Sequence, residues 1–477
     1  MGTKGFVISL VRHAPYDSKV SSTLHRCDVA VIGGGPAGAC CAIKLAAIGY
    51  RVTLIDKGSG RNQHRGESLP SSIRVVVDAL EIELPPSIVV ARPPEHLVYW
   101  GEMQGESRPA AASETSFLVW RGPFDALLRK TAVARGVRLE HAAVHRQHRS
   151  GNGHEVHYGD GESLECRFLV DASGRAGVRA RHYRRRETAF RTISQTAHFQ
   201  TDEAAPPTIV EAIPDGWIWS APLDNGLRDV TIMLDAYVSH QTALEASTVV
   251  RRLVGSSPLV EIVRGIDATP YSASRFCDRR VLLVGDAGSF LDPLSAHGVH
   301  KAMDGALIAA TVIHTTLERP AMEADAAGFY DAREKAIYKV TMERLARLYA
   351  QESRYAAQPF WRKRARGSAA APSMPDPRSP LRPEMKLRSA EGVEVVDAPV
   401  LEGDFIERRA VLVGSDKARP VRFSGAISLP ELFQQSCDAE NAAAAARASG
   451  FRFDEAYRAI DWLYRSGFLQ DAGSLIE

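Results

Sequence analysis

Short apolar runs separated by a glycine-bearing turn divide the first part of the chain into a strand, a turn, a helix and a second strand. The segment from Cys27 to Gly58 reads CDVAVIGGGPAGACCAIKLAAIGYRVTLIDKG, in which DVAVIG is apolar after its first residue. Such an uninterrupted apolar run is typical of a parallel strand that is buried on both faces. We therefore expect a β-α-β unit of a parallel sheet.

A different pattern occurs at residues 216–222, GWIWSAP, where two of the six tryptophans stand one residue apart. Residues i and i+2 of a strand face the same side, so Trp217 and Trp219 present both indole rings to one surface. Paired large aromatics on a strand usually fill a core, but they can also form the wall of a pocket. The heptapeptide alone leaves both interpretations open.

Near residue 360 the pattern changes to QPFWRKRARGSAAAPSMPDPRSPLRPEMKLRS, which is rich in proline, serine and basic residues. This composition indicates a domain boundary, and a solvated linker fits it better than a nucleic-acid arm because aromatic residues are not interleaved with the basic ones. Farther on, Ala456, Ile460, Leu463 and Tyr464 recur at helical spacing before Gly467. We expect a small strand-plus-helix module there, similar to a winged helix.

Composition narrows the class of protein. A chain of 477 residues is too long for a single core and should form two or three domains. A net charge of +2 argues against nucleic-acid or membrane partners, and no run is long enough to span a membrane. The six cysteines show neither CxxC nor histidine-paired metal spacing, so we expect reduced thiols in a cytoplasmic chain and no metal site.

The glycine turn after the first strand fits the GxGxxG pattern of dinucleotide-binding proteins. The first glycine allows the turn, the second lets a pyrophosphate approach the backbone, and the third lets helix and strand pack closely. The helix N-terminus offers N–H groups to the phosphates, and an aspartate ends the second strand, where it can accept hydrogen bonds from the ribose. The candidate cofactor-binding residues of this unit are Gly33, Gly35, Pro36, Ala37, Gly38, Asp56 and Lys57.

A second turn with the same chemistry lies in RRVLLVGDAGSFLDPLSAHGVHKAMDGALIAATVI, which begins at Arg279. An aspartate at the end of its strand can hold a ribityl hydroxyl, and the helix that follows can stabilise negative charge on a flavin ring. A generic loop would not explain Gly-Asp, a proline and a glycine at the helix start together. The candidate flavin-binding residues here are Gly285, Asp286, Pro293, Gly298 and Val299.

The motifs GGGPAG, RGESLPSS, DASGR, GWIWSAP and GDAGSFLDPLSAHGV resemble the flavin-dependent tryptophan halogenase-like branch of FAD monooxygenases. The resemblance covers roughly residues 27–365 and implies an α/β fold, in which a Rossmann-like FAD domain of the glutathione-reductase type carries an inserted antiparallel substrate sheet. The small C-terminal α+β domain is added to these. The resemblance also implies that Arg121 contacts the flavin and that the backbone of Val144 lies beside adenine. The less favoured alternative for Arg121 is an ordinary surface charge.

These expectations divide the chain as follows: an N-terminal extension at 1–26, a discontinuous FAD domain at 27–95, 117–185 and 272–360, a substrate-sheet domain at 96–116 and 186–271, a linker at 361–385 and a C-terminal domain at 386–477.

Two departures from the family bear on the reaction. Tryptophan halogenases carry an essential lysine shortly after the GEx motif, yet no lysine occurs here between Lys57 and Lys130, and Ser295 stands where they carry a glutamate. Hydroxylation through a flavin C4a-hydroperoxide needs neither group. Such an intermediate must be kept from water, which is a role for Trp217, Trp219 and Pro222 as walls of the reaction cavity.

Three residues are candidates for acid–base catalysis. His96 lies near the expected place of the halogenase lysine, His297 neighbours the flavin-side turn, and Glu67 belongs to the GES loop. An imidazole or a carboxylate there could take a proton from an indole or a phenol. Each residue also has a structural interpretation: a half-exposed histidine, a helix-end partner and an ion-pair member, respectively.

The added C-terminal module favours a substrate larger than a free metabolite, and the resemblance extends to monooxygenases that mature the tryptophylquinone cofactor of quinohemoprotein amine dehydrogenase. We therefore expect hydroxylation of a tryptophan in a peptide or protein, with O2 as co-substrate. Since no second GxGxxG follows a strand, NAD(P)H acts transiently or a separate flavin reductase supplies electrons. The alternatives are a halogenase, a geranylgeranyl-reductase-like enzyme and a flavin-loaded scaffold protein.

Overall fold

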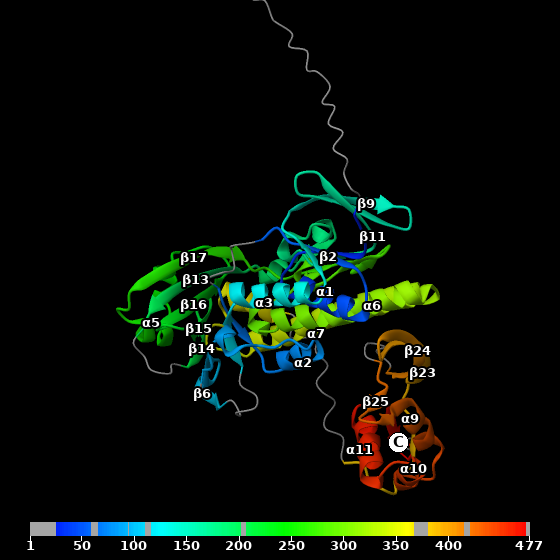
Figure 1. The fold of residues 1–477 in the computed structure, drawn as a ribbon. Coiled ribbons are helices and arrows are strands. Elements are labelled where there is room, and N and C mark those ends of the chain that lie inside the picture. Colours follow the sequence, from blue (N-terminus) through cyan, green and yellow to red (C-terminus); the bar gives the residue numbers. More distant parts are fainter. Residues whose placement is uncertain are drawn as a thin grey trace, which may run out of the picture.

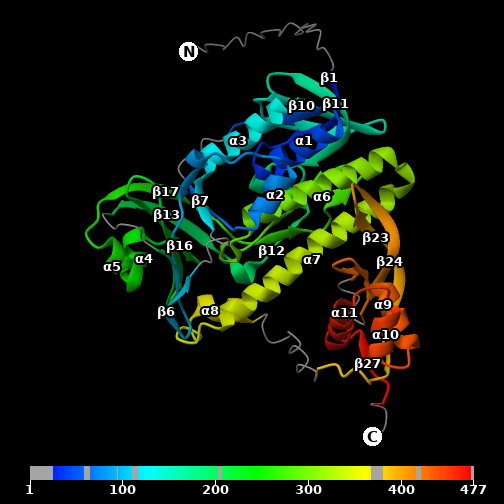
Figure 2. The same ribbon diagram turned by 60° about the horizontal axis from the view of Figure 1, so that its bottom comes forward.

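The computed structural model describes residues 25–58, 65–93, 95–109, 116–201, 207–366, 380–414 and 420–473. Most of the expected N-terminal extension, residues 1–24, and the central part of the expected linker, residues 367–379, lie outside the described residues. Two large sheets stand on either side of two long helices, and a smaller unit at the C-terminal end lies beside them (Figures 1 and 2).

One sheet, which we call the nucleotide sheet, has the predicted parallel centre. Its main order is β19-β20-β11-β1-β2-β8; β1, β2, β8, β11 and β20 run parallel, and a β9–β10 hairpin is attached to β11. The strands are β1 (His25–Ile32), β2 (Val52–Ile55), β8 (Arg138–Glu140), β9 (Val144–Ser150), β10 (Gly153–Tyr158), β11 (Glu162–Asp171), β19 (Cys277–Asp278) and β20 (Val281–Leu283).

The two faces of the nucleotide sheet are covered differently. Alternate residues of β1 pack under helices α1 (Pro36–Ile48), α3 (Arg121–Ala134) and α6 (Gly298–Glu318), whereas the intervening residues contact the β9–β10 hairpin. Burial on both faces explains why the β1 segment is apolar throughout. This helix–sheet–hairpin arrangement confirms the predicted Rossmann-like domain.

The second large sheet, the substrate sheet, has the order β17-β13-β16-β15-β14-β5-β6 and is antiparallel except between β14 and β5. Its outer face packs on helices α4 (His240–Glu245) and α5 (Val249–Val254). The strands are β5 (Glu95–Trp100), β6 (Met103–Pro109), β13 (Ile193–Gln200), β14 (Thr208–Ile213), β15 (Gly216–Pro222), β16 (Leu227–Leu234) and β17 (Leu259–Asp267).

Two three-stranded sheets and several short helices connect the large sheets. The sheet orders are β3-β7-β4 and β12-β18-β21. Their elements are β3 (Gly66–Leu69), α2 (Ile73–Ala79), η2 (Pro86–Ile88), β4 (Val89–Ala91), β7 (Phe117–Trp120), η3 (Gly174–Ala176), η4 (Ala180–His182), β12 (Arg184–Arg186), η5 (Thr188–Phe190), β18 (Tyr271–Ala273), η6 (Gly285–Ala287), β21 (Ser289–Phe290), η7 (Pro293–Ser295) and η8 (Pro320–Met322).

The expected linker begins later than the composition indicated. Helix α7 (Glu323–Ala350) runs past the inner face of the substrate sheet, and helix α8 (Pro359–Ala365) packs at its end (Figure 2). Trp361 is fully buried and donates from Nε1 to the carbonyls of Ile213 and Pro214, both at 3.0 Å. Arg364, also fully buried, donates to Asp235 at 2.7 Å. The predicted linker boundary at residue 361 was therefore too early, because the basic residues of this helix are also typical of a solvated linker.

The C-terminal unit also starts earlier than predicted, because Leu381 and Met385 belong to its core. Its elements are β22 (Leu387–Ser389), β23 (Glu394–Glu402), β24 (Phe405–Val413), β25 (Phe423–Ser424), β26 (Ile427–Ser428), α9 (Leu429–Asp438), α10 (Ala442–Ala448), α11 (Phe453–Arg465) and β27 (Leu469–Asp471). In the predicted helix α11, Ala456, Ile460 and Leu463 are buried as expected.

The β23–β24 hairpin attaches the C-terminal unit to the FAD domain. Ile406 is fully buried in the core shared with α6, and its N–H donates to Thr315 Oγ1 at 2.9 Å. The arms of the hairpin carry further ion pairs to this domain, such as Arg319 with Glu407 at 2.7 Å. The unit is thus anchored rather than merely tethered by a linker (Figure 2). Among the described residues, no helix has both the length and the apolar character to cross a membrane.

Burial of Trp361 makes a stability prediction. Trp361→Ala should lower the free energy of unfolding by about 3 kcal/mol or more, because it leaves a large cavity between α8 and the substrate sheet. Trp462→Ala is the matched control: this tryptophan is 42% exposed on α11, and its loss should cost less than about 1 kcal/mol. Urea unfolding followed by circular dichroism measures both, and equal losses would contradict the assignment of α8 to the packed body.

Candidate flavin and substrate site

The two glycine turns meet at the carboxyl edge of the nucleotide sheet. Gly33 has φ +101°, and a Cβ there would lie 2.4 Å from the carbonyl oxygen of Ala172. Gly285 has φ +63°, and its Cβ would lie 2.9 Å from that of Ala37. Only glycine combines these backbone angles with such close approaches. The sequence motifs, 252 residues apart by their numbers, therefore form one site.

The first turn fits a dinucleotide. A Cβ on Gly38 would lie 1.8 Å from the carbonyl oxygen of Gly33, so helix and turn are in contact. A Cβ on Gly35, by contrast, would meet no atom within 4 Å, which leaves open space directly in front of the α1 N-terminus. The N–H groups there suit the pyrophosphate of FAD. Asp56 follows β2 and lies 3.7 Å from Arg129, whereas Lys57 is exposed and has no described contact that supports its predicted role.

Positive charge surrounds the second turn. Burial raises the pKa of Asp286, and Lys301, Arg121 and Arg175 oppose that increase. Lys301 is buried on α6 and donates from Nζ to the carbonyl of Ser289 at 2.7 Å. Around an anionic cofactor these cations favour negative charge on its phosphates or its ring.

Arg184, which the sequence reading missed, joins two of the turns. Its guanidinium donates to the carbonyls of Gly174 and Arg175 in the DASGR turn at 2.9 and 2.8 Å, and to the carbonyl of Ala287 in the second glycine turn at 2.8 Å. The five donors of one guanidinium thus fix the relative position of both turns. No motif marks this residue, because its role depends on carbonyl groups that are distant in sequence.

Glu67 forms the ion pair that the sequence left as its structural alternative, and its partner is Arg121, which at 13% side-chain exposure is not the surface charge given as the alternative for that residue. Arg121 lies at the start of α3, and its guanidinium contacts Glu67 and Asp125 at 3.2 Å each. The Glu67 carboxylate is thus neutralised from one side. Within the described residues, no hydrogen bond or ion pair joins Glu67, His96 and His297 to one another, so they do not form a catalytic cluster.

Trp217 and Trp219 lie on the inner face of the substrate sheet, and their contacts there show what each side chain does. Trp217 is 3% exposed, and its Nε1 donates to the hydroxyl of Tyr349 at 3.2 Å. That hydroxyl donates to the buried carboxylate of Asp292 at 3.1 Å, next to Pro293 in the flavin-side turn. Burial raises the pKa of Asp292, while the N–H of Leu294 opposes the increase. The expectation that Trp217 walls an open chamber is corrected: it fills an aromatic core.

Trp219 lies farther along the same face and is half buried. It packs both against the Trp217 cluster and against a second cluster that includes Leu118 of β7. Trp219 therefore stands where the substrate sheet meets the FAD domain. Pro222 ends the strand and is buried.

A polar group on the same face was missed by the sequence analysis. His198 on β13 and Asp229 on β16 are opposite each other, and His198 Nε2 lies 3.5 Å from Asp229 Oδ2. Both side chains are buried, and neither of these two atoms has a hydrogen-bond partner among the described residues. A Cβ on Gly66, the first residue of β3, would lie 3.5 Å from the same Oδ2. The sequence did carry a signal for this pair, since polar residues alternate at Ser194, Thr196 and His198. The alternation indicates a functional face only when the strand is known to be buried on both faces, which the sequence did not show.

The remaining predicted residues are dispersed. His96 lies on β5, and its Nε2 is 3.0 Å from Ser116 Oγ; burial lowers its pKa. His297 is exposed at the N-terminus of α6, where Gly298 faces open space and Val299 is buried. Val144 begins β9 and packs against the core between the nucleotide sheet and the β9–β10 hairpin.

Comparison with known proteins decides the family. The sequence profile described as "Tryptophan halogenase" matches residues 101–376, more than half of the chain, and one described as "FAD dependent oxidoreductase" matches residues 28–68. The chain belongs to the tryptophan halogenase family. It is thus an FAD-dependent enzyme with the fold predicted from the motifs.

Among curated relatives, "Tryptophan 2-halogenase" of Chondromyces crocatus is 29% identical over 332 residues, which are 63% of this chain and 64% of that protein. "Flavin-dependent halogenase armH3" of Armillaria mellea is 27% identical over 365 residues, covering 65% and 72%. The chain therefore spans just under two thirds of the first relative's length.

Two solved structures match nearly the whole chain. "Peptidyl tryptophan dihydroxylase QhpG essential for tryptophylquinone cofactor biogenesis" has a TM-score of 0.71 at 25% identity, with 93% of this chain and 99% of that one covered. "CmlS, a flavin-dependent halogenase" has a TM-score of 0.78 at 22% identity, with 94% and 96% covered. The second likeness shows the fold alone.

The open space at Gly35 makes a cofactor prediction. Gly35→Ala should fold normally, because its methyl group meets no protein atom, but should weaken FAD binding at least about tenfold by occupying the pyrophosphate position. Gly328→Ala is the matched control, since a Cβ there on helix α7 also meets nothing within 4 Å. Fluorescence titration of the apoprotein with FAD measures both affinities. Equal affinities in the two variants would contradict the assignment of this turn.

Proposed function

We propose that this protein is an FAD-dependent monooxygenase that hydroxylates an aromatic, indole-type ring, and that its substrate is a tryptophan residue within a peptide or protein. The observation that carries the proposal is the missing halogenation chemistry. No lysine occurs between Lys57 and Lys130, and Ser295, half-buried in η7, stands at the position where halogenases carry a glutamate. Hydroxylation requires neither side chain.

FAD, when bound and reduced, supplies the oxygen-transfer chemistry together with O2. The residues of the protein bind the cofactor, orient the two turns around it and shield the reaction from water. The α1 N-terminus holds the phosphates, Arg184 fixes the turns, and Trp219 with the aromatic core behind it excludes water from the junction of the two domains. Water exclusion favours transfer of oxygen to the substrate over its release as hydrogen peroxide.

Two histidines on the inner face of the substrate sheet can move a proton. His96 stays neutral near pH 7, because burial lowers its pKa, and so can act as a base. His198 faces Asp229 across β13 and β16, and their facing atoms are free to bind a substrate N–H or hydroxyl. In this proposal His96 accepts the proton from the ring, and the His198–Asp229 pair, three to four strands away across the substrate sheet, binds a polar group elsewhere on the polypeptide substrate.

The peptide part of the proposal rests on two features. The solved structure that is covered over 99% of its length is named a peptidyl tryptophan dihydroxylase. In addition, the C-terminal unit is anchored to the catalytic body through Ile406 and Arg319, so it has a defined position from which to present a bound polypeptide. Halogenation is the second candidate, since the relative at 29% identity is named a tryptophan 2-halogenase.

The product distinguishes these activities. We expect a tryptophan-containing peptide, incubated with the reduced enzyme, O2 and chloride or bromide, to gain one or two oxygen atoms and no halogen. Mass spectrometry of the peptide and of free tryptophan measures this. A halogen-containing product would refute hydroxylation, and oxidation of free tryptophan alone would refute the peptide substrate.

A pH dependence tests His96. Because its pKa is below the ordinary value of about 6.5, kcat/KM should be flat from pH 8 to about 6.5 and fall at lower pH as the imidazole gains a proton. His96→Gln should lower the rate and remove this acidic limb, whereas His141→Gln, an exposed histidine of the FAD domain, should keep it. An unchanged acidic limb in His96→Gln would exclude His96 as the base.

A further inference from the structure

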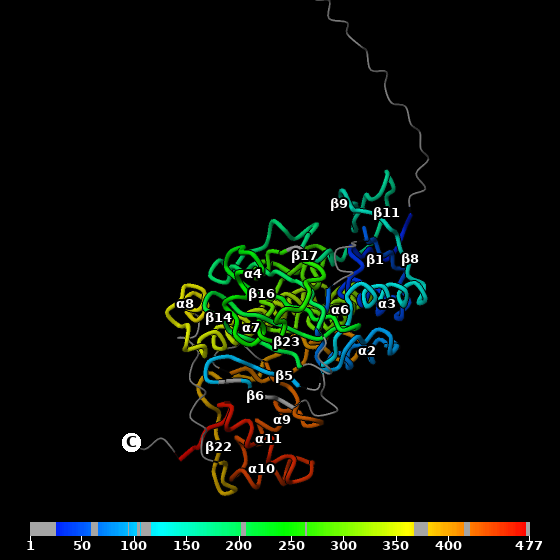
Figure 3. Tube along the Cα trace, turned by 90° about the vertical axis from the view of Figure 1, so that its left-hand side faces the viewer, coloured from blue at the N-terminus to red at the C-terminus, as the bar shows by residue number. Residues whose placement is uncertain are grey.

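The β9–β10 hairpin gathers histidines far from the proposed reaction site. Five of the fifteen histidines of the chain lie in residues 141–157. The hairpin covers the outer side of the nucleotide sheet, at the end of the molecule away from both the substrate sheet and the C-terminal unit (Figures 1 and 3). These histidines take no part in the two glycine turns or in the inner face of the substrate sheet.

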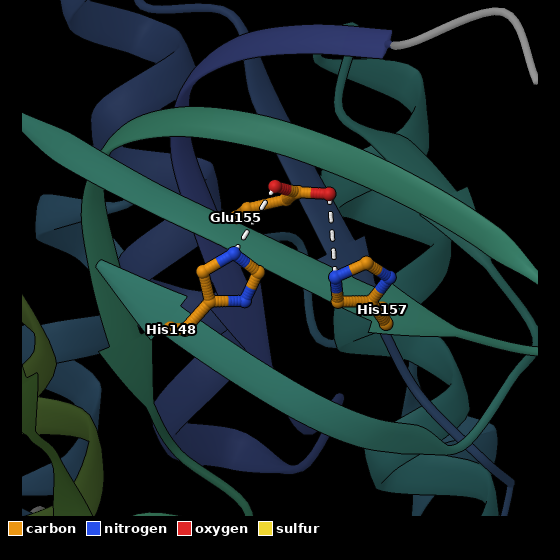
Figure 4. Close-up of side chains that lie close together, drawn as sticks. All are labelled: His148, Glu155 and His157. Carbon is orange, nitrogen blue, oxygen red and sulfur yellow. Dashed lines mark ion pairs between the residues drawn. The ribbon is translucent and has the colours of Figure 1, made fainter. Parts of the chain in front are cut away.

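Three of its side chains converge on the outward face of the hairpin. His148 of β9 is directly opposite Glu155 of β10, and His157 follows Glu155 by two residues, so all three project from the same face. Both imidazoles turn their Nε2 toward the carboxylate, His148 at 3.2 Å from Oε2 and His157 at 3.2 Å from Oε1 (Figure 4). The rings are nearly parallel, with an interplanar angle of 16°.

We propose that His148, Glu155 and His157 form a binding site for a divalent transition-metal ion, with Zn²⁺ as the expected occupant. Two imidazole nitrogens and one carboxylate oxygen are a donor set that zinc commonly takes. One ligand atom from each of the three residues lies within 4.8 Å of the others. Tetrahedral zinc with bonds of about 2.0–2.1 Å holds neighbouring ligand atoms about 3.3 Å apart. Each imidazole nitrogen lies 3.2 Å from one of the two carboxylate oxygens, so a small rotation of the Glu155 side chain brings one oxygen close to both nitrogens.

The surroundings set the expected strength of the site. The side chains are 24% to 40% exposed, so an ion can enter without rearrangement of the core, and water completes the coordination. Glu165 is opposite Glu155 on β11 but is already paired with Arg26 at 3.0 Å, and Arg146 is opposite His157. His148 Nδ1 has no hydrogen-bond partner among the described residues. Without a partner to orient that ring, the site should bind more weakly than a closed structural zinc site.

The sequence analysis predicted no metal site because the ligands follow no short motif. His148 and Glu155 come together only through the antiparallel register of the hairpin, with the turn at residues 151–152 between them. The bound ion would link β9 to β10. Since β9 begins at Val144, the residue expected beside adenine, the linked hairpin belongs to the wall of the nucleotide domain.

Zinc titration of the FAD-loaded protein tests the proposal after removal of adventitious metal with a chelator. Competition with a chromophoric chelator should give one Zn²⁺ per chain that is lost, or weakened about tenfold or more, in His148→Gln and in His157→Gln. His145→Gln is the matched control, since this exposed histidine of β9 lies outside the cluster and should keep the wild-type affinity. FAD content and circular dichroism establish that each variant is folded.

Two further measurements separate this site from binding elsewhere on the chain. Zn²⁺ should raise the thermal midpoint of the wild type and of His145→Gln, but not of the His148→Gln/His157→Gln double variant. Co²⁺ should give visible d–d absorption that the double variant lacks. Equal zinc stoichiometry and affinity in the wild type and the double variant would overturn the proposal. Because no readout depends on turnover, the result is independent of the proposed hydroxylation.

Discussion

The close contact between the two glycine turns is the constraint on which the site depends. Gly285 approaches Ala37 and Ala302 so closely that the first turns of α1 and α6 lie against each other, and any larger residue at these positions would separate them. Helix N-termini carry partial positive charge, so this packing places two of them at one edge of the nucleotide sheet. Lys301 and the arginines around Asp286 add to the same field. An anionic, elongated cofactor is the ligand that this arrangement suits.

Much of this part of the molecule could be predicted from the sequence, because its determinants are local. The strand before Gly33, the helix after it and the aspartate at the end of β2 follow directly from hydrophobic pattern and glycine spacing. The same holds for α11, whose buried face shows the helical period. Motifs of this kind carry their geometry within a few residues, so a single sequence is enough to locate them.

The parts that could not be predicted depend on distant pairings. Arg184, Tyr349 and the His198–Asp229 pair contribute to the site only through carbonyls or side chains from other elements. The tryptophan pair shows the limit of strand alternation: it gave the shared face correctly, yet Tyr349 and Trp361, from helices far along the chain, decide that Trp217 is core while Trp219 remains at the domain junction. Likewise the basic residues of α8 indicated a linker, whereas the buried Trp361 makes it part of the body.

Helix α6 connects the second glycine turn to the C-terminal unit. It has 21 residues and is therefore about 31 Å long. One end opens beside the flavin-side turn; the other end, at Thr315, carries the hairpin of the C-terminal unit. A helix that is packed at both ends moves as one body, so a displacement at one end is transmitted to the other. A displacement of the C-terminal unit would therefore act on the same helix whose N-terminus lies beside the second glycine turn, so these two distant parts of the protein are physically connected.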